Sequence, residues 1–595
     1  MAPSLDPAYE LVNQHDTHQE PEPDNTSRKP RHSPGLRSRT TKAVVVVLAA
    51  CFIVFAVFEI ISNDAVDRFR KAMSNASGGG ANCQCQPSDV PQYFQTKPQL
   101  WPGPTITGQP AFMAQTVALD PSQTYVPNEP LMTAIPIQGM TPQNQSIFQM
   151  MGYLSPYFPS PGFGIDEHPL PPGAEIIQLH MLSRHGARYP TLGSQVESFG
   201  QRLAAAAGTF KASGRLEFLN DWKYELGAEI LVPKGRQELY DSGVLHAYMY
   251  SRLYDPNTKI IARTTTQDRM LKSAENFMAG FFGLDWTNNV TLEVIIEADN
   301  FNNSLAGYLA CPNSGMNSAP FEASATWKNI YLEDATERFK SLVEGYEWTV
   351  DDTFAIQMLC PYETVAYGYS VFCDLFTYEE WEGFGYTIDI EFAGSSGFQS
   401  PTGRAVGIGY QQEFIARLKN QTLDYVGSQI NVTLDNNTDT FPLDQSLYFD
   451  FSHDSNIVSV LTAFGLKQFA PFLNPTRHPG PHNFTVSHVT PFGARLDMEI
   501  IRTPKPVSSD RSGYLSGGET KYVHFILNQR TLPLGASFSE CDASRVDGWC
   551  ELETFIRVQE KMPEIARYDY ACYSDLPKYK YGDVSDGVPP SLLSD

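Results

Sequence analysis

The heptapeptide Arg184-His185-Gly186-Ala187-Arg188-Tyr189-Pro190 is the most informative segment of this chain. It directly follows residues 175–183 (EIIQLHMLS), whose apolar and β-branched content is typical of a strand. The heptapeptide places two guanidinium groups and one imidazole within five residues. Guanidinium groups match the geometry of phosphate oxygens and stay charged at any working pH. A histidine between them is well placed to attack a bound phosphoryl group.

Strand and helix patterns alternate in the region around this heptapeptide. Residues 260–263 read as a strand, and residues 264–282 follow with apolar positions at helical spacing. Residues 447–451 read as a second strand, followed by Ser452-His453-Asp454 and a helix that stops at Gly465. The alternation predicts an α/β sheet. Because sites in such sheets lie at the carboxyl ends of strands, we expect His185 and His453 to lie together.

Size and charge restrict the possible functions. The chain has 595 residues and a formal net charge of -24, which argues against a nucleic-acid binder, since such proteins need a basic footprint. Any anion site must therefore be a local positive region, which Arg184 and Arg188 begin to form.

The N-terminal region predicts a membrane anchor. Residues 43–61 are almost uninterruptedly apolar, and about 20 residues are needed to cross a bilayer core. Lysines and arginines precede this run, which orients its N-terminal side towards the cytoplasm. We read the run as an uncleaved signal anchor of a type II membrane protein, with the remaining chain outside the cell or in the secretory or vacuolar lumen. A buried core helix is the alternative, against which the charge asymmetry argues.

The rest of the chain divides by composition. Residues 1–42 are expected to be a disordered cytoplasmic tail, 62–143 a Pro/Gly-rich stalk, 144–580 the catalytic domain and 581–595 a flexible C-terminus. Sequons that predict glycosylation occur at Asn75, Asn144, Asn289, Asn302, Asn420, Asn431, Asn436 and Asn483. Eight cysteines follow the anchor, an even number that suggests disulfides in an oxidising compartment.

These motifs together resemble the histidine acid phosphatase family, and within it the fungal phytase-like enzymes. Residues 184–190 match the family signature RHGxRxP, and His453-Asp454 match its distal HD motif. Residues 372–377 (FCDLFT) with Trp381, and residues 407–410 (GIGY), resemble the fungal enzymes. The likeness covers roughly residues 149–575. It implies a phosphoglycerate-mutase-like mixed sheet flanked by helices, with a smaller, mainly helical domain inserted within about residues 191–400.

The resemblance also implies roles for individual residues. Arg184 and Arg188 would hold the phosphate oxygens, and His453 would be a further donor. A third arginine is expected from the strand-to-helix segment; aligning residues 273–277 selects Arg269, with Arg263 as the substitute. His185 would take the phosphoryl group as a covalent phosphohistidine, and Asp454 would protonate the leaving group and then activate water. No metal or cofactor is expected, since the arginines supply the charge.

Other interpretations of these residues stay open. Arg184 or Arg188 could pair with carboxylates, Asp454 could be the N-cap of the helix that follows it, and His180 is expected to be a packed core histidine. The resemblance further implies three disulfides: Cys311 with Cys572, Cys360 with Cys373, and Cys541 with Cys550.

The sequence therefore predicts a membrane-anchored, glycosylated acid phosphatase acting on small phosphomonoesters, with an acidic pH optimum. Phytate is one candidate substrate, although no lysine follows Pro190 until Lys211, and phytases of the family carry lysines shortly after the signature. The alternative is a non-catalytic membrane-anchored glycoprotein that binds anionic ligands. A mutase-like relative is a further possibility. A serine hydrolase is disfavoured, because the chain has no GxSxG motif.

Overall fold

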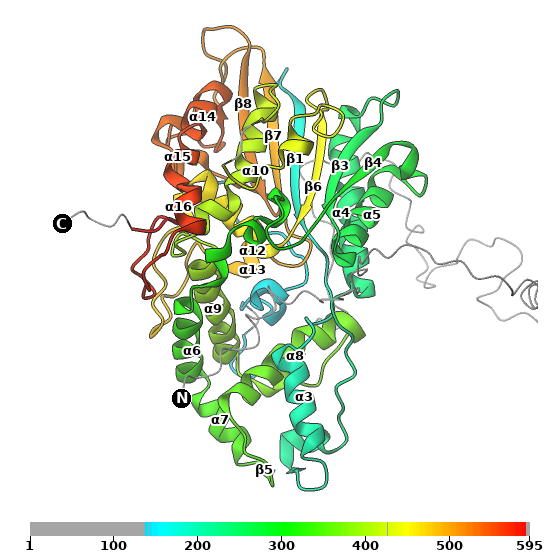
Figure 1. Ribbon diagram of the computed structural model, residues 1–595, viewed down its shortest axis with the longest axis vertical. Coiled ribbons are helices and arrows are strands. Elements are labelled where there is room, and N and C mark those ends of the chain that lie inside the picture. The colour runs from blue at the N-terminus through cyan, green and yellow to red at the C-terminus, as the bar shows by residue number, and fades with distance from the viewer. Residues whose placement is uncertain (1–136, 142, 425–426, 591–595) are drawn as a thin grey trace, which may run out of the picture. The chain divides into compact units, whose positions relative to one another are not determined.

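The computed structural model describes residues 137–141, 143–424 and 427–590, which fall within one compact unit (Figure 1). The predicted tail, anchor and most of the predicted stalk lie outside the described residues. The strands are β1 (Glu175–Arg184), β2 (Lys211–Ala212), β3 (Ile260–Thr265), β4 (Val290–Ile295), β5 (Val343–Glu344), β6 (Leu447–Ser452), β7 (Arg495–Thr503), β8 (Thr520–Leu527), β9 (Arg530–Leu532) and β10 (Cys550–Glu551).

The main sheet is mixed, as expected. In the described part of the chain its strand order is β10-β8-β7-β1-β6-β3-β4, and β9 pairs with β8. Strands β1, β6, β3 and β4 are parallel to one another, whereas β7, β8 and β10 continue the sheet antiparallel. The fold class predicted from the sequence is thereby confirmed.

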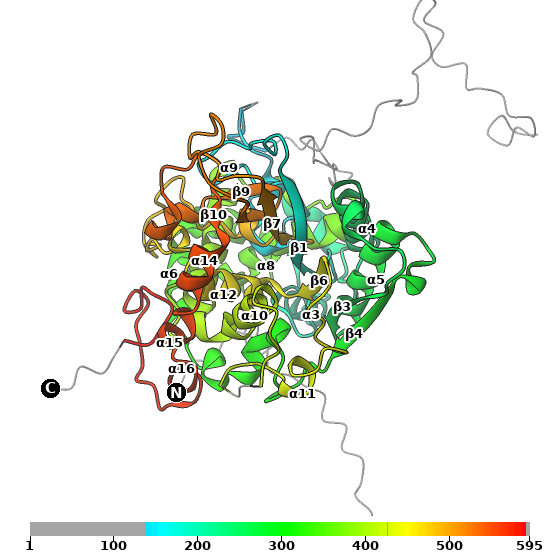
Figure 2. The same ribbon diagram turned by 90° about the horizontal axis from the view of Figure 1, so that it is seen from above.

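Helices cover both faces of the sheet. The α-helices are α3 (Gln195–Ala205), α4 (Pro233–Tyr250), α5 (Asp268–Phe282), α6 (Ala319–Tyr331), α7 (Glu333–Lys340), α8 (Val350–Tyr367), α9 (Tyr378–Ser395), α10 (Gly403–Leu418), α11 (Val432–Asp435), α12 (Asp454–Phe464), α13 (Val486–Val489), α14 (Leu552–Gln559), α15 (Met562–Ala566) and α16 (Tyr568–Tyr573). Figure 2 shows α4 and α5 on one side of the strands, and α10, α12 and α14 on the other.

The side chains of the central strand divide between these two layers. Leu179 and Met181 of β1 pack with Phe277 of α5, whereas Leu182 belongs to the core that contains Phe464 of α12. This alternation is the period of two that a strand buried on both faces requires.

The helical region lies within the range 191–400 but does not fill it. Helices α3 and α6–α9 gather at one end of the molecule, at the bottom of Figure 1. The range 191–400 also contains β3, β4, α4 and α5, which belong to the sheet layers. The helical region is therefore assembled from two separate segments, 195–205 and 319–395.

Both ends of the described chain contact the body. Ile137, expected to lie in the stalk, is buried, and the carbonyl of Gln138 accepts a hydrogen bond from the Tyr378 N–H. Asp586 lies in the segment expected to be flexible, yet its carboxylate is 2.7 Å from the Arg404 guanidinium. Residues 581–590 therefore make specific contacts with the domain.

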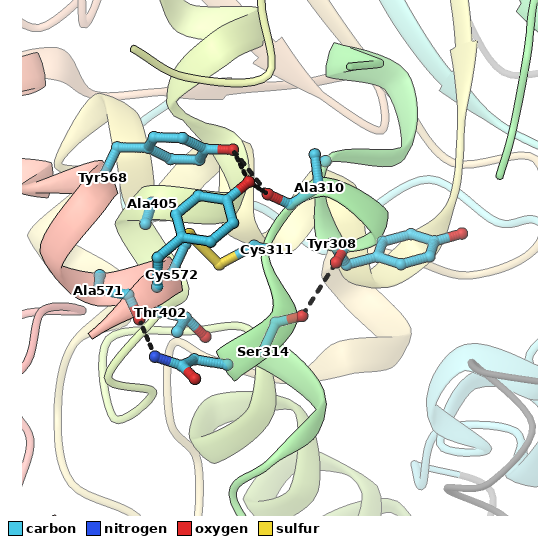
Figure 3. The surroundings of a disulfide bond; sticks show 12 residues. Tyr308, Ala310, Cys311, Ser314, Thr402, Ala405, Tyr568, Ala571 and Cys572 are labelled. Atoms are coloured by element: carbon cyan, nitrogen blue, oxygen red, sulfur yellow. Dashed lines mark hydrogen bonds between the residues drawn. A yellow bond between two sulfur atoms is a disulfide. The ribbon is translucent and has the colours of Figure 1, made fainter. Parts of the chain in front are cut away.

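The three disulfides implied by the resemblance are present: Cys311–Cys572, Cys360–Cys373 and Cys541–Cys550. Figure 3 shows the first, which ties the segment after β4 to α16. Next to it, the hydroxyls of Tyr568 and Tyr573 both donate to the carbonyl of Ala310. Cys51, Cys83 and Cys85 lie outside the described residues. Disulfides of this kind fit an oxidising compartment.

Within the described ranges, no helix has both the length and the apolar character needed to span a membrane. The segment predicted as the anchor, 43–61, is not among them.

Candidate active site

Parallel pairing of β1 and β6 brings the two sequence motifs together. Arg184, the last residue of β1, is in register with Ser452, the last residue of β6. The residues that follow therefore leave the sheet at the same edge. The rings of His185 and His453 lie 5.8 Å apart, centroid to centroid, at an angle of 70°.

His185 is buried and held in one tautomer. Its Nδ1 lies 2.9 Å from the carbonyl oxygen of Gly186. Because a carbonyl can only accept, Nδ1 carries the proton and Nε2 keeps its lone pair. Burial, and then the charges of Arg184 and Arg269, hold the pKa of His185 well below its ordinary value. The ring is therefore neutral, with a free Nε2.

The loop that carries His185 packs closely against the start of α4. A Cβ added to Gly186 would lie 2.2 Å from the carbonyl oxygen of Gly235, and one added to Gly235 would lie 1.9 Å from that of Ala187. The buried carboxylate of Glu238 accepts the Ala187 N–H at 2.7 Å. Both glycines are required for this approach, and Glu238 fixes the loop. The sequence analysis did not identify Glu238.

Arg184 is completely buried and is oriented by backbone carbonyls. Its Nη1 donates to the carbonyls of Tyr153 at 2.6 Å and Thr490 at 2.9 Å. Its Nη2 lies 2.5 Å from Oδ2 of Asp454, whose side chain is 18 % exposed. Its guanidinium also stacks 4.6 Å from the Phe492 ring centroid.

Asp454 is the first residue of α12, and His453 is the N-cap. The Asp454 Oδ1 accepts the Ser455 N–H at 2.7 Å, while its other oxygen faces Arg184. Burial raises the pKa of Asp454, but Arg184, the Ser455 N–H and Arg188 together hold it below its usual range. Asp454 is therefore a carboxylate in this arrangement.

The structure distinguishes the two candidates for the third arginine. Arg269 is the second residue of α5; its Nη1 lies 2.6 Å from a Glu229 oxygen, and its charge acts on His185. Arg263 instead points away from this site into a buried network, 2.7 Å from Asp450 and 2.6 Å from Glu413. Arg269, the residue selected by alignment, is the one that lies near His185.

Arg188 is nearly buried, and its Nη1 donates to the Tyr189 carbonyl at 2.9 Å. The positive charge expected in this acidic chain is therefore concentrated at one edge of the sheet, in Arg184, Arg188 and Arg269. His180, by contrast, is a core residue that stacks on Tyr448. Among the described residues no cluster suited to bind a metal ion occurs.

The structure adds a carboxylate that the sequence analysis missed. Oε2 of Glu297 lies 3.0 Å from Nε2 of His453 and 2.5 Å from the Thr265 hydroxyl, while Oε1 accepts from Tyr308 at 3.1 Å. Glu297 follows β4 by two residues, so its place at the carboxyl end of a strand was the available signal.

The fold and the site thus define an α/β protein with a buried cluster of arginines around a neutral histidine. Residues 175–528 match the model of the histidine phosphatase superfamily, branch 2. The chain is 31% identical over 422 residues to Phytase A of Arthroderma benhamiae, covering 69% of this chain and 88% of that protein. It is 29% identical over 445 residues to an acid phosphatase of Schizosaccharomyces pombe, covering 71% and 88%.

The chain belongs to the histidine phosphatase superfamily, branch 2. The resemblance drawn from the signature and HD motifs is confirmed, and so is the enzyme class, a phosphoric monoester hydrolase of the acid phosphatase and phytase kind. Among solved structures, the phytase from D. castellii shares the fold, with a TM-score of 0.58 and 23% identity over 74% of this chain and 92% of that one.

Proposed function

We propose that this chain hydrolyses phosphomonoesters through a covalent phosphohistidine on His185, with Asp454 as the proton donor. The observation that carries the proposal is the hydrogen bond from Nδ1 of His185 to the Gly186 carbonyl. It leaves Nε2 unprotonated and available, in a ring that burial and then the neighbouring arginines keep neutral.

The arginines have a definite role in this scheme. A phosphomonoester is negatively charged and repels a nucleophile, so its charge must first be neutralised. Fixed positive charge comes from Arg184, Arg188 and Arg269. Each guanidinium group can donate two parallel hydrogen bonds to phosphate oxygens. His453 and the N-terminus of α12 lie at the same edge and add donors.

The reaction then proceeds in two displacements. In the first, Nε2 of His185 bonds to phosphorus, the ester P–O bond breaks, and the leaving alkoxide takes the proton of Asp454. In the second, water bonds to phosphorus, the P–N bond breaks, and the Asp454 carboxylate takes the proton of that water. The products are an alcohol and inorganic phosphate, and His185 returns to its starting state. The Gly186 carbonyl stabilises the charged, phosphorylated ring.

The first step requires Asp454 to be protonated, whereas its contact with Arg184 favours the carboxylate. A bound phosphate competes for Arg184 and places like charge beside Asp454, and both effects raise a carboxyl pKa. Protonation of Asp454 is therefore coupled to substrate binding and favoured in acid. We propose an acidic optimum on this basis.

Phytate is one proposed substrate, because several relatives carry the name Phytase A. A broader range of phosphomonoesters fits equally, since the S. pombe relative is called an acid phosphatase and the sequence after Pro190 is poor in lysine.

We further propose that residues 43–61 anchor the enzyme as a type II membrane protein, with the catalytic domain outside the cytosol. Of the proposed glycosylation sites in the described part of the chain, Asn420, Asn436 and Asn483 are exposed.

To test the mechanism, the rate of phosphate release from an aryl phosphate and from phytate is measured for the full-length wild-type chain and for full-length His185→Ala. His168→Ala, at an exposed histidine, is the control. We expect His185→Ala to lose activity on both substrates and the control to keep it. Equal rates for His185→Ala and the wild type would contradict the mechanism. A wild type that binds phosphate without turnover would favour the non-catalytic alternative.

A further inference from the structure

Glu297 touches none of the residues expected to react, yet it is almost fully buried directly behind His453. We propose that Glu297 is a positioning residue that keeps His453 doubly protonated, so that His453 presents a charged N–H to the phosphate group. This inference rests on the proposed function and extends it to a residue outside the two sequence motifs.

The hydrogen bonds of Glu297 show that it is ionised. Its two oxygens meet three potential donors: the ring of His453, the hydroxyl of Thr265 and the hydroxyl of Tyr308. Burial raises the pKa of Glu297, but His453, Thr265 and Arg269 lower it to about 2. Across the pH range of an acid phosphatase the group is a carboxylate, which only accepts.

The state of His453 follows from this partner. Its Nε2 faces the Glu297 carboxylate at 3.0 Å, so Nε2 carries a proton. A neutral imidazole has one N–H, and with Nε2 protonated its Nδ1 would offer a lone pair. A lone pair repels a phosphate oxygen. Only the imidazolium form can bond to Glu297 and donate to phosphate at the same time.

The surroundings of His453 explain why the carboxylate is needed. Several titratable and charged groups face this part of the site. They come from β1 and the loop after it, from α5, from the segments after β4, and from α12: Arg184, His185, Arg188, Arg269, Glu297, Tyr308 and Asp454. The arginines disfavour a further cation, whereas Glu297 lies in direct contact with the ring. Removing the charge of Glu297 therefore takes away the carboxylate that contacts the His453 ring.

The test substitutes Glu297→Gln in the full-length enzyme. Glutamine keeps a carbonyl that accepts from Nε2 but removes the charge. Glu499→Gln is the matched control: Glu499 is also buried and also accepts from a tyrosine, Tyr250 at 2.7 Å, and contacts a histidine, His524 at 2.9 Å, but not in the candidate site.

We expect kcat/KM of Glu297→Gln to fall about tenfold more at pH 7 than at pH 5, moving the alkaline limb of the pH profile towards acid by about one unit. Glu499→Gln should keep the wild-type profile. A uniform loss at all pH values in Glu297→Gln would overturn the proposal, because it would show a merely structural role.

A second measurement needs neither the Glu297→Gln variant nor turnover. Ring ¹⁵N chemical shifts of histidine-labelled wild-type enzyme, with His453→Gln to assign the signal, report the protonation of His453 directly. We expect the imidazolium pattern at pH 7. A neutral pattern would overturn the inference even in an active enzyme, whereas an imidazolium in an inactive one would leave it standing and contradict only the proposed function.

Discussion

The Nη2 atom of Arg184 lies 2.5 Å from Oδ2 of Asp454, so the residue expected to bind phosphate and the residue expected to donate the proton contact each other directly. Arg184 is fully buried and fixed by the carbonyls of Tyr153 and Thr490, whereas Asp454 is partly exposed. In the proposed mechanism, a phosphate oxygen therefore competes with Asp454 for the Arg184 guanidinium.

The first prediction concerns this proton donor. Asp454→Asn keeps the shape but removes the proton, so cleavage of an alkyl phosphate, a poor leaving group, should slow by about 10²–10⁴-fold. An aryl phosphate with an acidic phenol needs little protonation and should lose much less. The measurement is kcat for both substrates in both enzymes. An equal loss on the two substrates would show that Asp454 does not protonate the leaving group.

The second prediction separates the two arginines near β3. Arg269→Ala should lower kcat/KM by about 10²–10³-fold, because Arg269 contributes positive charge near the proposed phosphate site. Stability should change little, because the partner of Arg269, Glu229, is 38 % exposed. Arg263→Ala should instead lower the free energy of unfolding by about 3–5 kcal/mol, since it breaks a buried ion-pair network with Asp450 and Glu413.

Steady-state kinetics and thermal unfolding of both variants check this division. A stable, inactive Arg263→Ala beside a fully active Arg269→Ala would reverse the assignment.

The third prediction tests the close approach of the signature loop to α4. Gly186→Ala should unfold at a markedly lower temperature than the wild type. Its Cβ would lie 2.2 Å from the Gly235 carbonyl oxygen, a backbone atom that cannot rotate away as a flexible side chain could. Gly513→Ala is the control, since a Cβ there meets nothing within 4 Å. Similar melting temperatures for both variants would contradict the packing described.

The fourth prediction concerns the pH dependence of stability. His482 donates from Nδ1 to the Gly480 carbonyl and from Nε2 to Asp389 at 2.9 Å, so both nitrogens carry protons. Burial lowers the pKa of His482. The hydrogen bond to Asp389 and the negative charge of Asp389 together have a larger, opposite effect, so the pKa lies above the ordinary value. The pair's contribution is therefore complete below the unfolded pKa of about 6.5 and is lost as pH rises through the folded value.

Melting temperatures of the wild type and His482→Gln between pH 5 and 9 test this. The difference should be largest at pH 5 and should shrink in alkali, while His168→Gln should show no such trend. A difference that grows with pH would have the wrong sign.

The features that the sequence predicted are those encoded by neighbouring residues. The strand at 175–183 and the strand at 447–451 were each placed within one residue of the observed β1 and β6, because their apolar runs are local. The helix expected from residue 264 begins instead at Asp268, since Thr264 and Thr265 extend β3.

The features that escaped prediction depend on distant parts of the chain. Glu238 supports the signature from 51 residues away, and Glu297 reaches His453 across 156 residues. Neither lies in a motif: the place of Glu297 just after a strand is a weak signal, and the contacts of both residues depend on the folded arrangement. The three disulfide pairings are predicted by the family resemblance and not by the spacing of the cysteines, because spacing does not determine connectivity.

Acid-free rapid quenching of full-length Asp454→Asn with ³²P-labelled aryl phosphate tests whether His185 carries the covalent intermediate. With its base for the second step removed, this variant should accumulate radiolabel that is stable in alkali and labile in acid, on the peptide containing residues 184–190. His185→Ala should carry none. Turnover by the wild type with no label on His185, or with label on another residue, would contradict the account.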